Sequence, residues 1–144
     1  MVTVFDVDAQ ELIGKLKEEL KNLKGMSVPE WAKYVKSGSS RGKPPEQEDF
    51  WYIRAASILR QLYVTGKPIG VQRLRIKYGR KEQNSHKPAH KRKAGGKIIR
   101  NILQQLEAEN LIKKDSIKDH KGRTITKKGK SLVDKVATQI KKGE

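Results

Sequence analysis

Apolar residues recur at helical spacing near the start of the chain and predict an amphipathic helix there. Asp8 followed by Glu11 can form a capping box, in which each side chain bonds a free backbone N–H of the first turn. A lysine and a glycine at positions 24–25 are typical of a helix end. The apolar stripe between these signals consists of Leu12, Ile13, Leu16, Leu20 and Leu23.

The segment that begins at Ser27 predicts a second helix. Ser27 and Glu30 have capping-box spacing, and Met26 and Trp31 occupy the two positions of a hydrophobic staple. The side chains expected to face the core are Trp31, Ala32 and Val35.

Residues 37–45 are rich in Gly, Ser and Pro and indicate a polar linker before a third helix over residues 48–63. The apolar residues of this third helix, Trp51, Ala55, Ile58, Leu59 and Leu62, recur at three and four positions and predict one buried face. We expect this helix to be the centre of the core. Gly70 can then cap a short helix that carries Val71, Leu74 and Tyr78.

A strongly periodic helix is predicted over residues 94–109, with Ile98, Ile99, Ile102, Leu103 and Leu106 facing inward. Asn110 suits a left-handed cap, after which Leu111 packs back on Leu106. Residues 111–115 and 123–126 are expected to be short strands joined by a turn over residues 119–122. Thr126 then caps a final helix whose inner residues are Leu132, Val133, Val136, Ala137 and Ile140.

The order helix, short helix, helix, two-stranded hairpin, helix is the plan of a winged helix. We therefore predict a mostly α, winged-helix-like helical domain with a small two-stranded β-hairpin and extra N-terminal helices. Residues 1–144 are expected to form this single domain, with a solvated basic loop over residues 79–93.

The charge of +17 is concentrated in one part of the chain. Residues 73–100 hold eleven Lys or Arg residues against one acid, Glu82, which gives a net charge of +10. A cationic segment between packed elements predicts binding to a polyanion, although runs of like charge are often only solvated.

Other classes of protein are disfavoured by composition. The absence of Cys excludes disulfides and thiol nucleophiles and suits a cytosolic protein. No apolar run approaches the roughly 20 residues that a membrane span needs, and we see no signal peptide. His86 and His90 have a helical metal-binding spacing, but Pro88 lies between them, so no metal site is expected. We also find no catalytic motif and expect neither enzymatic activity nor a cofactor.

The winged-helix plan suggests a DNA reader, but the spacing argues for RNA. The turn of a DNA-reading helix-turn-helix has about three or four residues, whereas here residues 79–93 separate the two helices. The exposed side of the following helix includes Glu107 and Glu109. Folded RNA, which is recognised through phosphates and shape, fits this surface better. A winged-helix transcriptional regulator and a protein-interaction module stay open as alternatives.

Arg54 and Arg60 on the third helix have no acid at i+4. Each can contact a phosphate, extend along the surface as an ordinary exposed arginine, or pair with Glu48 or Asp49. Trp31 and Trp51 are in phase with apolar stripes and are expected in the core rather than stacked on bases. Phe50 and Tyr52 stay open.

Four segments resemble the archaeal and eukaryotic small-subunit ribosomal protein family S19e: residues 28–31 (VPEW), 50–57 (FWYIRAAS), 78–84 (YGRKEQN) and 123–130 (RTITKKGK). The resemblance covers essentially the whole chain. It implies a winged-helix-like fold, residence in the head of the small subunit, binding of ribosomal RNA, and a role in small-subunit maturation and precursor-RNA processing.

The resemblance also implies partners and places Arg54, Tyr78, Arg80 and Lys81 in the family's motifs. The expected partners are small-subunit ribosomal RNA, its precursor and neighbouring small-subunit proteins, with no membrane contact and a monomer when free in the cytoplasm. Charge extends the set, so that the full list of expected RNA-binding residues is Arg54, Arg60, Lys77, Tyr78, Arg80, Lys81, Lys87, Lys91, Arg92, Lys93, Lys97 and Arg100.

Overall fold

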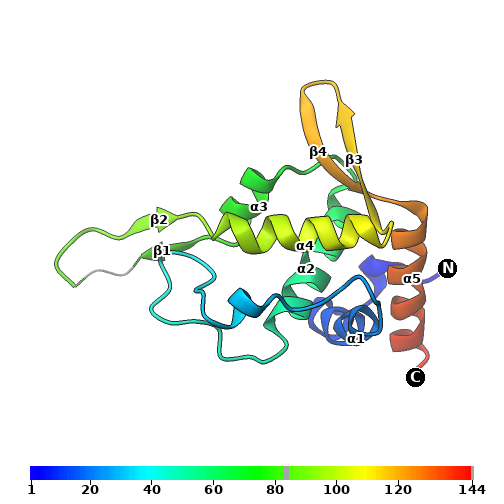
Figure 1. Cartoon of the computed structure of the whole chain (residues 1–144). Helices are drawn as coiled ribbons and strands as arrows, with labels where there is room; N and C mark the ends of the chain where they lie inside the picture. Colours follow the sequence, from blue (N-terminus) through cyan, green and yellow to red (C-terminus); the bar gives the residue numbers. More distant parts are fainter. Residues whose placement is uncertain (83–84, 144) are drawn as a thin grey trace.

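The computed structural model describes residues 1–82 and 85–143 (Figure 1). The elements in chain order are η1 (Val4–Asp6), α1 (Ala9–Lys21), η2 (Glu30–Lys33), α2 (Phe50–Thr65), α3 (Val71–Lys77), β1 (Arg80–Glu82), β2 (His90–Arg92), α4 (Gly96–Ala108), β3 (Ile112–Ile117), β4 (His120–Ile125) and α5 (Lys127–Lys141). The predicted order appears as α2, α3, α4, β3–β4 and α5, with α1 packed beside α2 and α5. The mostly helical, winged-helix-like fold is therefore confirmed.

Asp8 caps helix α1 as predicted, but the return bond of the capping box, from the Asp8 N–H to the Glu11 side chain, is not formed among the described residues, and the helix ends earlier than predicted. The Asp8 carboxylate accepts hydrogen bonds from the backbone N–H of Gln10 (2.9 Å) and Glu11 (3.3 Å). The helix stops at Lys21, and Gly25 does not serve as its cap. Instead, the N–H groups of Asn22 and Leu23 bond carbonyls three residues earlier (3.2 Å each), which closes the last turn tightly without a glycine.

The predicted second helix is wrong, because only the 3-10 turn η2 forms there. Ser27 does not cap it; Pro29 occupies that position without a side-chain bond. The Ser27 carbonyl is held instead by the Gln105 side-chain amide of α4 at 2.8 Å. Beyond η2, Tyr34 is largely exposed, so a longer helix would bury little on that side. Trp31 is half-buried and packs edge-on against Trp51, with ring centres 5.8 Å apart.

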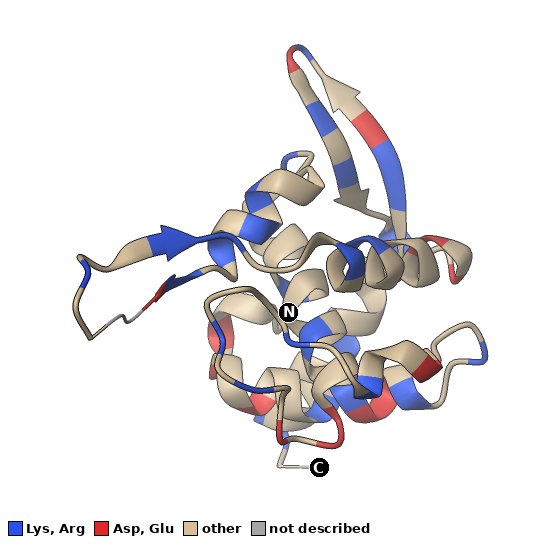
Figure 2. Ribbon diagram, turned by 60° about the vertical axis from the view of Figure 1, so that its left-hand side comes forward, with Lys and Arg blue, Asp and Glu red and all other residues tan. Residues whose placement is uncertain are grey.

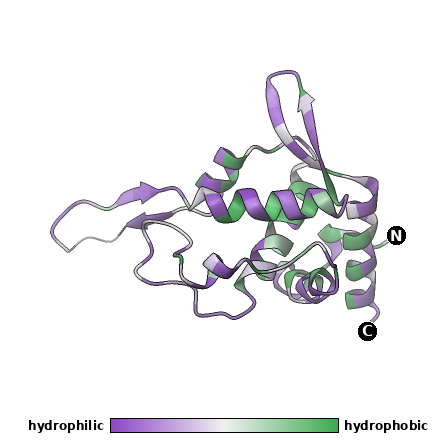
Figure 3. Ribbon diagram, in the orientation of Figure 1, coloured by the Kyte–Doolittle hydropathy of each residue, from purple (hydrophilic) through white to green (hydrophobic). Residues whose placement is uncertain are grey.

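Helices α2 and α4 supply much of the core, as expected. Their predicted inward-facing residues are all buried. The Trp51 ring nitrogen also donates to the Gln105 side chain at 2.9 Å, which ties the two helices together. Figure 3 shows the apolar faces of these helices turned toward the body of the molecule.

The predicted C-terminal end of α4 and the predicted start of α5 are confirmed. Asn110 follows α4 in the left-handed region with φ of 60°. The Leu111 N–H then bonds the Leu106 carbonyl at 3.1 Å, and both side chains are buried. At the start of α5, the Thr126 hydroxyl accepts from the Gly129 N–H at 3.1 Å.

Strands β3 and β4 form a longer hairpin than predicted, and the turn is displaced. They pair from Ile112 with Ile125 to Ile117 with His120, so the turn lies at residues 118–119 rather than 119–122. Lys118 takes up the left-handed conformation there (φ 52°). Gly122 lies within β4, where its strand runs against the segment before α3. Ile69 and Arg123 exchange two backbone hydrogen bonds of 3.1 and 3.0 Å, which fix the segment before α3 to the β3–β4 hairpin, the wing of this fold.

The segment expected to be a loop over residues 79–93 contains a second hairpin. Strand β1 pairs antiparallel with β2, matching Arg80 with Arg92 and Glu82 with His90. The hairpin projects from the body, with positive charge on both strands (Figure 2). Gln83 and Asn84 of the predicted loop lie outside the described residues.

A single cluster of buried apolar side chains extends from Val4 to Ala137 and involves α1, α2, α4 and α5. The assignment of residues 1–144 to one domain stays a prediction. Among the described residues, no helix is both long enough and apolar enough to cross a lipid bilayer.

Candidate nucleic-acid interface

Arg54 on α2 contacts two aromatic rings, one from α2 itself and one from the residue that follows α3. Its guanidinium carbon is 5.1 Å from the centre of the Phe50 ring and 4.0 Å from that of the Tyr78 ring. The Tyr78 hydroxyl is bonded to the Ser57 hydroxyl at 2.7 Å. Both rings therefore make cation–π contacts with the guanidinium and restrict its position.

The electrostatics of this cluster reflect partial burial. Burial lowers the pKa of Arg54, Tyr78 opposes this effect, and the nearby charge of Arg41 lowers the pKa further. Burial likewise raises the pKa of Tyr78, against the hydrogen bond from Ser57 and the charges of Arg54 and Arg60. Arginine nonetheless stays charged in proteins, so the cluster presents a fixed positive group at its surface.

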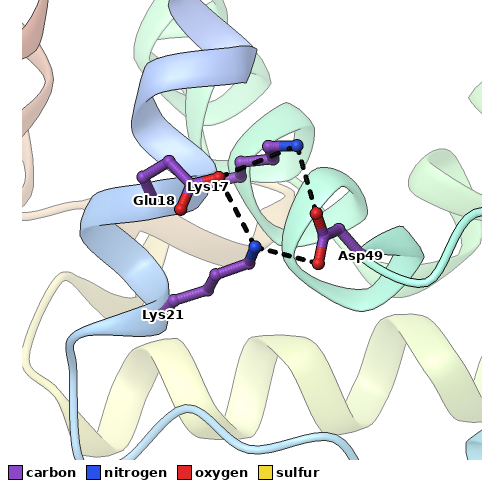
Figure 4. Close-up of polar contacts among 4 residues, drawn as sticks. All are labelled: Lys17, Glu18, Lys21 and Asp49. Carbon is purple, nitrogen blue, oxygen red and sulfur yellow. Dashed lines mark hydrogen bonds and ion pairs between the residues drawn. The ribbon is translucent and has the colours of Figure 1, made fainter.

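Neither of the acids that could have neutralised Arg54 and Arg60 does so: Asp49 is engaged elsewhere, and Glu48 takes part in none of the ion pairs of the described residues. Asp49 binds two lysines of α1, at 3.2 Å from Lys17 and 2.9 Å from Lys21 (Figure 4). The ion pairs found among the described residues do not include Arg54 or Arg60. The Arg60 Nε is moreover buried without a hydrogen-bond partner among these residues. Both arginines thus lack the internal carboxylate partner that the sequence left possible.

The base of the β1–β2 hairpin is fixed to α3. The Arg75 Nε donates to the Ala94 carbonyl at 2.8 Å, and the Ala94 N–H donates to the Arg75 carbonyl at 2.9 Å. Lys93 reaches the Gln72 side chain at 3.4 Å. Arg75 is therefore a structural residue, and its bonds set the direction in which the hairpin leaves the body.

The other predicted cations are all exposed, and they differ in whether they form an ion pair or a cation–π contact. Arg92 pairs with Glu82 at 3.2 Å, and the Lys97 nitrogen lies 4.5 Å from the centre of the Trp31 ring. Both side chains stay exposed at the surface. The cations that are exposed without an ion pair to another described residue are Lys77, Arg80, Lys81, Lys87, Lys91, Lys93 and Arg100.

The structure adds Arg41 and Lys43 to this surface, which the sequence did not suggest. Both come from the linker before α2, and both line a groove with Arg54 and Arg80. The linker is brought there by a bridge between Gly38 and Ala94 and by a 2.7 Å bond from the Gly95 N–H to the Ser37 carbonyl. Their only sequence signal is two cations in a polar linker, and their position depends on tertiary contacts.

Aromatic residues and histidines play other parts. Trp51 is buried, as expected, and Phe50 lies half-buried under Arg54, while Tyr52 packs against the core. His86 and His90 are exposed on the hairpin. No group of three metal-ligating side chains occurs within residues 1–82 and 85–143.

Residues 3–143 match the family model described as Ribosomal protein S19e. The chain belongs to this family. It is 42% identical over 141 residues to small ribosomal subunit protein eS19 of Aeropyrum pernix, covering 97% of this chain and 90% of that protein. It is 43% identical over 144 residues to eS19 of Haloarcula marismortui, covering 97% and 92%. It is 38% identical over 142 residues to eS19G of Ascaris suum, covering 99% and 94%.

The resemblance to S19e drawn from the sequence is thereby confirmed across nearly the whole chain. All three S19e relatives are named as proteins of the small ribosomal subunit, and their names give no support to a DNA-binding regulator. The fold also argues against a DNA-binding regulator. Residues 78–95, which include the projecting β1–β2 hairpin, separate α3 from α4, whereas a DNA-reading helix-turn-helix has a short turn at this place.

Proposed function

We propose that this S19e protein is a structural constituent of the small ribosomal subunit that binds ribosomal RNA and carries no catalytic activity. One observation supports RNA binding above the others: the Arg54 guanidinium lies over Phe50 and Tyr78, forms no ion pair with any described residue, and lines a groove with Arg80 of the basic hairpin. Such a group is prepared to bind a phosphate, because arginine matches that ion with two parallel N–H donors. The proposed contacts are Arg54, Arg60, Lys77, Tyr78, Arg80, Lys81, Lys87, Lys91, Arg92, Lys93, Lys97 and Arg100.

The proposal extends to subunit assembly. The protein, one domain over residues 1–144 and a monomer when free in the cytoplasm, supports maturation of the small subunit and processing of the precursor RNA. Neighbouring small-subunit proteins are its other partners, and it has no membrane partner. This part of the proposal is supported by membership of the S19e family and by the exposed basic residues of the surface, which can bind phosphates.

Sedimentation of a cell lysate tests both parts. The wild-type chain is expected in small-subunit fractions and in their precursors. Arg54→Gln and Arg60→Gln should shift toward the top of the gradient and cause precursor RNA to accumulate, with unchanged circular dichroism. Lys135→Gln removes one charge from the exposed side of α5 and serves as the matched control.

Three outcomes contradict the proposal. Absence of the wild-type chain from small-subunit fractions removes the ribosomal role. Loss of helical signal in the arginine variants makes those residues structural. A clear preference for one duplex DNA sequence over ribosomal RNA fragments at matched salt favours the regulator instead.

A further inference from the structure

A groove runs between linker residues 37–47 and strand β1. Its volume is about 640 Å³, and its basic lining side chains are Arg41, Lys43, Arg54 and Arg80. A second depression of about 340 Å³ adjoins it and shares Arg41 and Arg80. We call the two together the linker groove; the second part adds Ser39, Ser40, Lys81 and Glu82.

The acids of the linker groove are already paired, whereas three of its arginines are not. Glu46 forms an ion pair with Lys43, and Glu82 forms one with Arg92. Arg41, Arg54 and Arg80 take part in none of the ion pairs found among the described residues. The charge left over in the groove is therefore positive.

Two parts of the linker groove are anchored by contacts within the protein, the start of the linker and the side chain of Arg54. The linker is held to the start of α4 by the Gly38–Ala94 bridge, and the same Ala94 is bonded to Arg75 of α3. Arg54 is held by its two rings. A site that is ordered in advance loses less conformational entropy on binding.

Placing arginines together without a counterion opposes folding. The charge of Arg41 acts on Arg54 and disfavours its charged form, although the two residues come from different elements. Groups perturbed in this way by burial and by a like charge cluster at functional sites. An anion in the groove would relieve the repulsion.

We propose that the linker groove binds consecutive phosphodiester groups of a single RNA strand, with Arg41, Arg54 and Arg80 as the phosphate contacts. This inference rests on the proposed function and assigns Arg41 and the linker a role in it. The two adjoining depressions, of about 640 and 340 Å³, are too large for one isolated tetrahedral anion to fill. Ser39 and Ser40 offer hydroxyl donors, and Lys81 continues the basic path onto the hairpin.

NMR of the arginine Nε–H groups in isotope-labelled full-length protein tests the site. The two probes are inorganic phosphate and a single-stranded RNA of mixed sequence, about ten nucleotides long. RNA should shift the signals of Arg41, Arg54 and Arg80 together and to saturation. Saturation should need a lower concentration of RNA phosphate groups than of inorganic phosphate. The signals of Arg73 and Arg123, which lie outside the groove, should move little.

Variants give the second readout. Arg41→Gln should weaken binding of the short RNA about fivefold and reduce the slope of log affinity against log salt by about 0.7. Arg41→Lys should keep the slope, because it keeps the charge. Lys135→Gln should weaken binding of the short RNA less than about twofold and reduce the slope by less than about 0.35.

Several results overturn the inference. Parallel shifts of all exposed arginines show an unselective surface. Inorganic phosphate binding at least as tightly as RNA makes this a site for a free anion, and a polyglutamate peptide binding more tightly than RNA makes it a protein site. The short RNA is not ribosomal, so the two proposals can fail separately. If RNA shifts the NMR signals of the groove arginines but the protein does not sediment with the small subunit, only the ribosomal proposal is contradicted. If the wild-type protein sediments with the small subunit but Arg41→Gln binds the short RNA as tightly as the wild type, only the proposal for the linker groove is contradicted.

Discussion

The guanidinium carbon of Arg54 lies 4.0 Å from the centre of the Tyr78 ring, although Arg54 is on α2 and Tyr78 is the residue that follows α3. The Tyr78 hydroxyl is in turn bonded to Ser57, one turn after Arg54 on α2, at 2.7 Å. The end of α3 is thus attached to α2 through one side chain, which also orients the arginine. Stability of the α2–α3 contact and the position of Arg54 therefore depend on the same ring, but on different atoms of it.

Tyr78→Phe and Tyr78→Leu separate these two roles. Tyr78→Phe keeps the ring and loses the hydroxyl bond, so the free energy of unfolding should fall by about 1 kcal/mol, with nearly unchanged RNA affinity. Tyr78→Leu also loses the cation–π contact, worth a further ~1 kcal/mol, and should weaken RNA binding because Arg54 is released. Urea unfolding and a fluorescence binding assay measure the two quantities. Equal RNA affinity of the two variants would show that Tyr78 does not position Arg54.

The sequence predicts the elements that bury an apolar face. Ile98, Ile99, Ile102, Leu103 and Leu106 recur at helical spacing because one side of α4 packs into the core, and the pattern records that packing. The caps at Asp8, Asn110 and Thr126 are equally local, since each depends on bonds within a few residues.

The β1–β2 hairpin and the linker groove are not recorded in this way. A strand is recognised by alternating apolar and polar residues, but Arg80–Glu82 and His90–Arg92 contain no apolar side chain. The pairing of these strands follows from the fixed positions of α3 and Ala94. Arg41 lines the same groove as Arg54 because the linker is bonded to the segment just before α4, and no local spacing in the sequence expresses that contact.

Gly122 should be intolerant of any side chain. A Cβ there would lie 2.7 Å from the Gly70 nitrogen and closer still to the carbonyl of Ile69, both of which are backbone groups, and the Ile69 carbonyl is held by the hydrogen bond from the Arg123 N–H. Gly122→Ala should therefore lower the free energy of unfolding by about 1–3 kcal/mol. Gly42→Ala is the matched control, because a Cβ at Gly42 meets no atom within 4 Å and should change stability by less than about 0.5 kcal/mol. Equal stability of the two variants in urea would mean that the wing can move away from α3 at little cost.

The Asp49 contacts in Figure 4 predict an acid-dependent loss of stability. Hydrogen bonds from Lys21 and then Lys17 hold the pKa of Asp49 below its ordinary value. A carboxyl with a lowered folded-state pKa stabilises the fold above its unfolded pKa of about 4, and this contribution is lost as pH falls through the folded value. The urea midpoint should thus drop on acidification, and Asp49→Asn should reduce that drop. Some dependence should remain, because Thr3 lowers the pKa of Asp6 in the same direction. An identical acid profile in Asp49→Asn would contradict the assignment.

The environment of Tyr63 predicts that stability falls as pH rises in the alkaline range, which is opposite in sign to the effect of Asp49. Its hydroxyl donates to the Asp134 carboxylate at 2.7 Å, and burial followed by this bond raises the pKa of Tyr63 to about 12. A tyrosine with a raised folded-state pKa stabilises the fold below its unfolded value of about 10, and the contribution is lost as pH rises toward 12. The Tyr63 ring signals in NMR should accordingly titrate late, and unfolding should become easier across this interval. In Asp134→Asn the titration should move to lower pH yet stay above that of unfolded tyrosine, since burial of the ring remains. A wild-type Tyr63 that ionises near 10, or one that is unaffected by Asp134→Asn, would show that the hydroxyl faces solvent instead of α5.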